Sequence, residues 1–297
     1  MAIIDTPSTY FQTTVYTGNA SNNHAITNSG QSNLAPNWVW IKNISTGSNR
    51  LFDSVRGVNK IFTSDNTSAS DGNYSSTLTA FGSNGFTLAN DSDGFNVNLN
   101  SNSYASWNWA AGTSFSNNAG ANGASLASTG SVNTTAGFSI VSWTSPNSNA
   151  NTIAHGLGSV PEMIIIKKKG SSGGWVVYHQ YMGNTHGMFL STNAAKEDNA
   201  GFFNDTSPTS TVFTTGSDGA LINNTMIAYC FASKQGYSKM GSYLGNNSAG
   251  GSATQFIYTG FKPALVMVKE VSGTSNWVVY DSTRNGSLSE NNINISY

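Results

Sequence analysis

Three internal copies of one sequence pattern constrain this chain more than any other feature, because each copy has to adopt the same local structure. Every copy has an apolar run that follows a proline and ends at a lysine six residues further on. The three runs span residues 36–42, 161–167 and 263–269, beginning at Pro36, Pro161 and Pro263 and ending at Lys42, Lys167 and Lys269. A tandem repeat is therefore the starting point for the fold.

Further matches surround each apolar run in the same order. A second apolar segment follows it at residues 51–57, 175–179 and 277–286, and another piece precedes it at 10–16, 137–143 and 236–243. Residues 86–110 and 212–232 share an ending that the third copy lacks. We therefore expect modules at 1–112 and 136–235, an incomplete third module at 236–297, and a linker or long loop in the Ala/Ser/Gly/Asn-rich stretch 113–135.

The shared segments have the composition of β-strands. They are four to eight residues long, rich in Val, Ile, Trp, Tyr, Phe and Thr, and bounded by Gly, Asn, Ser and Asp, which is typical of strands joined by turns. The best helix candidate, residues 192–198, is at most two turns long, and its Asn and Asp favour a turn about as strongly. The sequence predicts an all-β fold.

Some of these strands are apolar on both faces. In residues 38–41 and 163–166 both alternating faces are apolar, so we expect burial on both sides or contact with a neighbouring module or chain. Residues 138–143 and 104–109 have one mixed face, as in a sheet that meets water on one side. Tandem antiparallel β-sandwich modules, lectin-like or jelly-roll-like, account for both patterns.

The charge content excludes several classes of partner. Only 9% of the residues are charged, against about 25% in ordinary soluble domains, while 7 Trp, 12 Tyr and 15 Phe argue for a folded chain. A net charge of −1 offers little to a nucleic-acid backbone or an anionic membrane. Cys230 is the only cysteine, so the chain has to be stable without a disulfide, and no apolar run is long enough to span a membrane.

Two motifs resemble enzyme signatures but fit turns or structural roles better. Residues 170–174 satisfy G-x-S-x-G, yet a strand rather than a helix follows them, which indicates a hairpin loop. The four histidines have no zinc-binding spacing, and Cys230 sits in a predicted strand. His24 and His155 fall at comparable places before their prolines, which favours structural histidines. The remaining histidines are His179 and His186.

Two acidic patterns remain. Asp91 and Asp93 in the run Asp-Ser-Asp-Gly suggest a calcium loop, although the EF-hand pattern is missing and a tight turn is favoured; both interpretations stay open. Asp53 with Arg56, and Asp281 with Arg284, keep a three-residue spacing in two copies, which favours a charged hydrogen bond that fixes a turn. We therefore expect no catalytic, cofactor-binding or metal-binding residue.

A family resemblance covers nearly the whole chain. Residues 38–43, 51–57, 85–88 and 107–112, continued at 153–158, 161–167, 175–179 and 277–286, resemble an uncharacterised domain family found in structural proteins of marine bacteriophages. The resemblance implies a virion-associated protein, such as a tail fibre, an appendage or a capsid-decorating component. It offers no catalytic residues to carry over.

We therefore expect a phage structural protein with a host-adhesion role rather than an enzyme. It would assemble in the host cytoplasm and stand on the particle surface, with other copies of itself, other virion proteins and a host-surface glycan as partners. A free carbohydrate-binding module and a tail-associated glycan-degrading enzyme are the alternatives. The first requires exposed aromatic rings, and the second requires two carboxylates across a cleft.

Three structural predictions follow from the repeat. Each proline should open a strand at an equivalent position in its copy. Lys42, Lys167 and Lys269 should be solvated residues at strand ends, with their stems on apolar surface. The third copy, without closing strands, should be completed by another chain or another virion protein, because an open sheet edge invites pairing.

Overall fold

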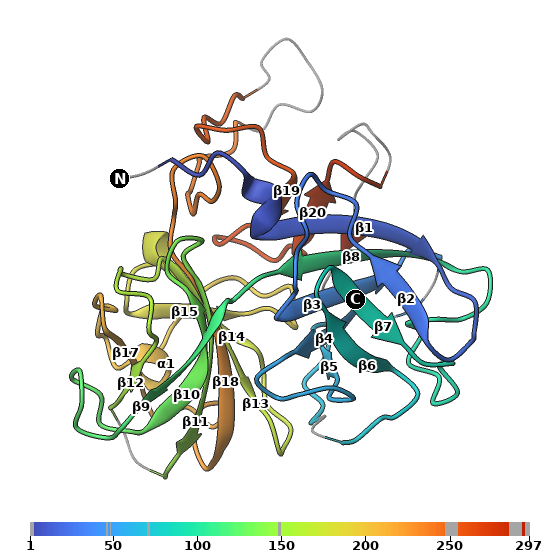
Figure 1. The fold of residues 1–297 in the computed structure, drawn as a ribbon. Helices are drawn as coiled ribbons and strands as arrows, with labels where there is room; N and C mark the ends of the chain where they lie inside the picture. The colour runs from blue at the N-terminus through green and yellow to red at the C-terminus, as the bar shows by residue number, and fades with distance from the viewer. Residues whose placement is uncertain are drawn as a thin grey trace.

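The computed structural model describes residues 3–45, 47, 49–69, 72–147, 150–246 and 255–284, and the backbone of 293–294. Within these residues nearly all regular structure is antiparallel β-sheet, so the predicted all-β sandwich class is confirmed. Figure 1 shows the first copy in blue to teal, the second in green to orange, and β19 and β20 above their junction.

The first copy is a sandwich of a five-stranded sheet, ordered β1-β8-β3-β4-β5, and a three-stranded sheet, ordered β2-β7-β6. Between the sheets lies a core that includes Val39, Ile41, Phe52, Phe86 and Tyr104. The elements are a short 3-10 helix, Pro7–Thr9, and the strands β1 (Phe11–Thr17), β2 (His24–Thr27), β3 (Trp38–Asn43), β4 (Asn49–Asp53), β5 (Phe62–Thr63), β6 (Leu78–Gly82), β7 (Gly85–Leu88) and β8 (Ser103–Trp109).

The second copy has an eight-stranded sheet, ordered β16-β15-β14-β13-β18-β11-β10-β9, and a two-stranded sheet of β12 and β17. Its own core includes Trp143, Ile164, Phe202 and Phe213. The elements are β9 (Thr113–Asn117), β10 (Ser128–Asn133), β11 (Phe138–Ser145), β12 (Asn151–Ala154), β13 (Met163–Lys168), β14 (Val176–His179), a 3-10 helix (Gln180–Met182), β15 (His186–Phe189), β16 (Glu197–Asp198), α1 (Ala200–Phe203), β17 (Val212–Thr215) and β18 (Asn224–Phe231).

Two expectations for this region are corrected. The expected linker at 113–135 contains β9 and β10, which pair with each other and extend the large sheet beyond β11. Gly130 permits this close pairing, because a Cβ there would lie 2.0 Å from the carbonyl oxygen of Ile140. The helix candidate at 192–198 forms no helix, because residues 193–196 are irregular and Glu197 and Asp198 form β16; the four-residue helix α1 follows it.

The third copy contributes a small sheet ordered β19-β20-β21. Its strands are β19 (Leu265–Val268), β20 (Val278–Asp281) and β21 (Ile293–Asn294). Within the described residues of this copy, no second sheet faces it. The described residues of the third copy thus contain the strands that correspond to β3 and β4 and to β13 and β14.

The three post-proline runs occupy equivalent places, as predicted. β3 pairs with β8 and β4, and β13 pairs with β18 and β14. The register agrees as well, since the first residues of β3, β13 and β19 lie opposite Asp53, His179 and Asp281, respectively. Each strand begins two residues after its proline rather than at the proline itself.

One large core joins all three copies. Side chains of β3 alternate between the sandwich core of the first copy and this shared core, which receives Trp38 and Trp40. Trp38 stacks on Tyr229 of the second copy with ring centroids 4.4 Å apart, and Trp277 of the third copy is 5% exposed. The predicted contact between modules explains why these strands are apolar on both faces.

Candidate functional site

The most distinctive chemical groups of the chain lie where the copies meet. Asp53 ends β4, and its Oδ2 accepts a hydrogen bond of 2.5 Å from Nε of Arg56, with both side chains fully buried. The backbone N–H of Arg56 donates to the other carboxylate oxygen at 2.8 Å. The guanidinium also donates to the carbonyl of Leu51 and lies 3.7 Å from the ring centroid of Phe62. The pair fixes a turn, as its spacing predicted.

The third copy repeats this arrangement atom for atom. Nε of Arg284 donates to Oδ2 of Asp281, its backbone N–H donates to Oδ1 at 3.0 Å, and its guanidinium donates to the carbonyl of Val279. Burial lowers the pKa of Arg284, and the Asp281 carboxylate opposes that shift. The two buried ion pairs make equivalent hydrogen bonds, which indicates that they have the same structural role in the two copies.

Each buried carboxylate also accepts a hydrogen bond from another copy. The Tyr229 hydroxyl on β18 donates to Oδ2 of Asp53 at 2.8 Å, and Nε1 of Trp107 on β8 donates to Oδ2 of Asp281 at 3.2 Å. Tyr229 and Trp107 are equivalent, since they lie opposite Ile165 and Trp40 in their sheets. Burial, and then the Asp53 charge, raise the pKa of Tyr229 well above its usual value, so the hydroxyl stays protonated and donates.

A second pair of hydrogen bonds, both donated by tryptophan indoles, also joins the copies. Nε1 of Trp175 in the second copy donates to the carbonyl of Thr63 in the first, and Nε1 of Trp277 in the third donates to the carbonyl of Phe189 in the second. With the carboxylate contacts, the second copy donates to the first, the first to the third, and the third to the second. The hydrogen bonds therefore connect the three copies in a closed ring, and each copy donates to the next in the same direction. We call this set of four hydrogen bonds, donated by Tyr229, Trp107, Trp175 and Trp277, the intercopy ring.

The lysines differ from their predicted role in one case. Lys167 is 0% exposed, and its Nζ donates to the carbonyls of Gly173 and Thr67 at 2.9 and 3.3 Å. Burial lowers its pKa to about 8, with Lys168 and Arg56 contributing. The prediction of a solvated side chain is wrong for Lys167, because a loop of the first copy covers it. Lys42 and Lys269 are partly exposed and donate to the carbonyls of Gly47 and Glu270.

The G-x-S-x-G loop connects β13 to β14, as a hairpin should. It also binds the first copy, because the Ser172 hydroxyl and the Gly173 N–H both donate to the carbonyl of Thr67, at 3.1 and 2.9 Å. Together with Lys167, three donors converge on that oxygen. The serine is used in contact between copies rather than presented on a nucleophile elbow.

The histidines bind neighbouring protein groups. Nδ1 of His24 lies 2.7 Å from Oδ1 of Asn98, while His155 is fully buried between the Leu157 N–H and the carbonyl of Thr209. Burial lowers the pKa of His155 to about 4. The strand pairing aligns Ile26 with Ile153, so the residue equivalent to His24 is Asn151, four residues before His155. The expected equivalence of His24 and His155 is therefore wrong.

The candidate calcium loop is a tight turn. Both carboxylate oxygens of Asp91 accept backbone N–H groups, from Phe95, Val97 and Asn98, and Asp93 accepts from Ser76 at 3.4 Å. Among the described residues, no group of three or more His, Cys, Asp or Glu side chains is placed to hold a metal ion. The same residues include no helix of the length and apolarity that would cross a membrane.

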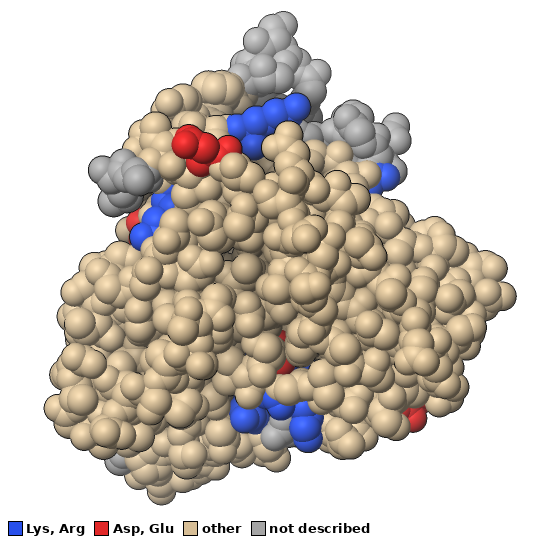
Figure 2. All heavy atoms as spheres, in the orientation of Figure 1, with Lys and Arg blue, Asp and Glu red and all other residues tan. Residues whose placement is uncertain are grey.

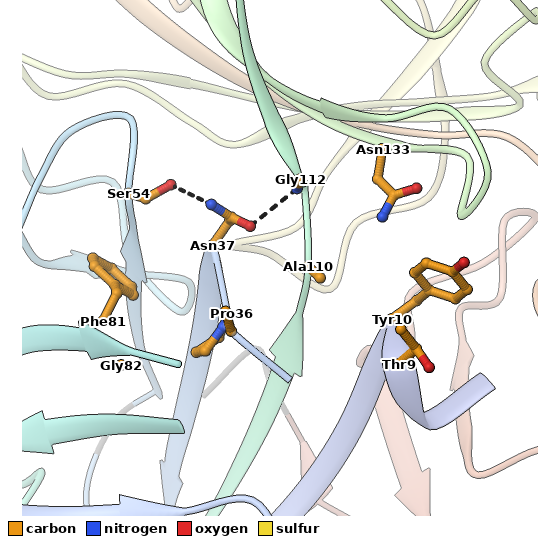
Figure 3. Close-up of a pocket in the computed structure, with 11 residues that line it drawn as sticks. Thr9, Tyr10, Pro36, Asn37, Ser54, Phe81, Gly82, Ala110, Gly112 and Asn133 are labelled. Atoms are coloured by element: carbon orange, nitrogen blue, oxygen red, sulfur yellow. Dashed lines mark hydrogen bonds between the residues drawn. The ribbon is translucent and has the colours of Figure 1, made fainter. Parts of the chain in front are cut away.

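A groove of about 400 Å³ lies between the first copy and β10. Figure 3 shows the rings of Phe81 and Tyr10 on opposite sides of it, with Asn37 between them. Nδ2 of Asn37 donates to Oγ of Ser54 at 3.0 Å, and its Oδ1 accepts the Gly112 N–H at 3.1 Å. The amide is therefore held by protein groups, while the two rings supply apolar walls.

Sequence reasoning missed the intercopy ring. Tyr229 and Trp107 stood out only as members of a shared closing strand, and nothing in their local pattern pointed to Asp53 or Asp281. The one available signal was the recurrence of the Asp–Arg spacing in the first and third copies.

Comparison with known proteins gives one family. The model of a family described as a domain of unknown function (DUF7483) matches residues 6–296. No curated protein matches the chain, and no solved structure does.

Proposed function

Since the chain belongs to the DUF7483 family, whose function is unknown, we propose from its own structure that it is a structural protein of a bacteriophage particle. It would serve as a tail fibre, an appendage or a capsid decoration, exposed on the particle and contributing to host attachment. The observation that carries this proposal is the intercopy ring, in which the buried ionic and aromatic donor groups lock three β-copies into one body.

The surface of the protein supports a binding or packing role. Figure 2 shows a face that is almost entirely uncharged, with acidic and basic residues gathered in a few small groups. Neutral polar side chains keep such a surface soluble without a strong electrostatic field. We infer that such a surface packs against other subunits through shape and hydrogen bonds, because it carries little charge to steer or repel a partner.

The proposal is tested on purified particles of the phage that encodes this chain. We expect antibody against the chain to label intact particles in electron microscopy, and a cryo-EM map to contain density that fits the ring of three copies. Absence of the chain from particles free of lysate would overturn the proposal. Sustained release of fragments from host polysaccharide by the purified chain would show instead that it is an enzyme.

A second candidate function is glycan binding in the groove of Figure 3. Tyr10 and Phe81 face the groove from opposite sides, and sugars stack on aromatic rings. A glycan array with the wild-type chain should show hits that Phe81→Ser loses and that Tyr181→Ser, which changes an exposed tyrosine elsewhere, keeps. An array without hits would remove this candidate.

A further inference from the structure

The groove between the first copy and β10 lies where the backbone of the chain repeats but the side chains do not. Three backbone hydrogen bonds beside the groove recur in the second copy with lengths that agree within 0.2 Å. From donor to acceptor they join Ala110 to Tyr10, Asn37 to Trp109 and Ser54 to Asn37 in the first copy, and Ala232 to Gly137, Glu162 to Phe231 and Gln180 to Glu162 in the second. The residues that line the groove can therefore be compared with their equivalents one by one.

The second copy has no aromatic ring at the position of Tyr10. Gly137 stands there, and Lys234 stands where the first copy has Gly112, two residues after the equivalent donors. A Cβ on Gly137 would lie 2.8 Å from Cε of Lys234, so the lysine side chain lies against the glycine. The first copy thus has an aromatic wall and an open glycine where the second has a glycine covered by a lysine.

The position of Asn37 differs in charge between the copies. Glu162 takes this place in the second copy, and its Oε2 accepts hydrogen bonds from the Ser233 hydroxyl and, at 2.9 Å, from Nε2 of Gln180. The second copy therefore carries both a lysine and a glutamate at positions that are neutral in the first. Since the same backbone accommodates either set, the repeat does not require the neutral, open groove of the first copy.

The lining of the groove favours an uncharged ligand. Among the described residues, the eleven that line the groove carry no charge. Its volume of about 400 Å³ falls within the range of about 300–1,000 Å³ that is usual for small-molecule sites. An ionised ligand would give up part of its hydration there without gaining a counter-ion, which is unfavourable. Tyr10, Phe81 and Asn133 are each half-buried, so part of every one of these side chains remains accessible.

Two hydrogen-bond donors face this neutral space. Oδ1 of Asn133 accepts the Ala136 N–H at 2.9 Å, which fixes the orientation of the amide. Its Nδ2 forms no hydrogen bond with the residues that the structure describes, and Figure 3 shows this nitrogen turned toward Ala110. Oγ of Ser54 accepts from Asn37, so its own proton is available for donation. A ligand with hydroxyl oxygens can accept from both groups.

We propose that the groove binds an uncharged sugar ring, with its apolar face on the ring of Tyr10 or Phe81 and a hydroxyl oxygen accepting from Nδ2 of Asn133. Sugars combine these two kinds of surface, and their apolar faces stack on aromatic rings. The bound ring would contact the first copy and β10 of the second together. This inference rests on glycan binding in the groove as the second candidate function, and it specifies the class of glycan and the residue that recognises it.

The test measures binding of matched sugars to the full chain by isothermal titration calorimetry. Each pair has the same ring stereochemistry and differs only at C6, which carries a hydroxymethyl group in one sugar and a carboxylate in the other. The pairs are the trisaccharides of galactose, glucose and mannose with those of their uronic acids. We expect at least one neutral trisaccharide to bind, about tenfold or more tightly than its uronic counterpart, because the groove offers no cation to the carboxylate.

Replacing Asn133 by serine removes the donor and keeps the turn. A serine hydroxyl can accept the Ala136 N–H as the asparagine oxygen does, but it lacks the amide nitrogen. We expect binding to weaken by about three- to tenfold, the usual size for one hydrogen bond. Asn66→Ser is the matched control, since Asn66 is exposed and its Oδ1 accepts the Ser68 N–H at 3.0 Å. That variant should keep the wild-type affinity within about twofold.

Replacing Tyr10 by leucine tests the aromatic wall separately. Leucine keeps apolar bulk but removes the ring, so we expect binding to weaken by about three- to tenfold. Tyr181→Leu changes a tyrosine that is 58% exposed elsewhere and should leave binding unchanged. Melting temperatures within about 2 °C of the wild type would show that all four variants remain folded.

The outcomes separate this inference from the proposals on which it rests. A uronic trisaccharide that binds more tightly than its neutral counterpart, in a manner sensitive to Tyr10→Leu, would overturn the neutral ligand while glycan binding in the groove stands. Wild-type affinity in Asn133→Ser would overturn the role of Asn133. No binding of any of the six trisaccharides would overturn both this inference and the second candidate function. Labelling of phage particles does not depend on any of these results.

Discussion

Replacing Asp53 by alanine tests the intercopy ring most sharply among single substitutions. The change removes the carboxylate that accepts from Nε of Arg56 at 2.5 Å, from its backbone N–H at 2.8 Å and from the Tyr229 hydroxyl at 2.8 Å. Removing one partner of a buried ion pair costs about 3–5 kcal/mol, and leaving a buried hydroxyl without its acceptor costs about 1–3 kcal/mol. Since the two effects share one site and do not simply add, we expect a loss of about 4 kcal/mol or more.

Urea unfolding followed by tryptophan fluorescence measures this loss. Asp198→Ala, which changes an exposed carboxylate on the edge strand β16, is the matched control and should stay within about 0.5 kcal/mol. The double variant Asp53→Leu with Arg56→Met should recover much of the loss, because an apolar pair removes the stranded charge. A loss below about 1 kcal/mol for Asp53→Ala would refute the reasoning.

Three further predictions follow from buried groups. Tyr229→Phe should cost about 1.5–3 kcal/mol, because it removes one hydrogen bond to a buried charged group, whereas Tyr181→Phe on the surface should cost almost nothing; equal effects in urea unfolding would contradict this. Lys167 has a pKa of about 8 in the folded chain against 10.5 in the unfolded chain. The free energy of unfolding should therefore rise by about 3 kcal/mol between pH 8 and 10.5. A Lys167→Met chain that shows the same rise would disprove the assignment. His155 has a pKa of about 4 in the folded chain against 6.5 in the unfolded chain. The free energy of unfolding should therefore fall by about 3 kcal/mol as the pH falls from 6.5 to 4. Unfolding curves of His155→Gln should show a smaller loss over the same pH range.

The repeat made the strand equivalences predictable. Proline followed by an apolar run identified β3, β13 and β19, because the same local pattern recurs at the same distance from its neighbours. The apolar character of both faces of β3 and β13 predicted burial on both sides or contact with a neighbouring module or chain, and the structure shows contact between modules. Both inferences depend on short-range periodicity, which sequence records directly.

Other features depended on tertiary contacts that short-range patterns do not record. β10 contains Ser, Thr, Gly and Asn, and it forms a strand because β11 offers an edge to pair with. Lys167 ends an apolar run as Lys42 does, yet its Nζ is buried and donates to the carbonyl of Thr67 in another copy. The partners of Tyr229 and Trp107 lie more than 170 residues away. Contacts between copies were therefore the main omission.

Hydrogen exchange at increasing urea concentration tests the central claim most directly, namely that the three copies share one core. Peptides that cover β3, β13 and β19 would report the opening free energy of each copy in the same sample. A shared core predicts that the slowest amides of β3 and β13 converge on one opening free energy, and that Asp53→Ala lowers both by the same amount. Two separate opening free energies, with only that of β3 lowered by Asp53→Ala, would show that the copies fold independently.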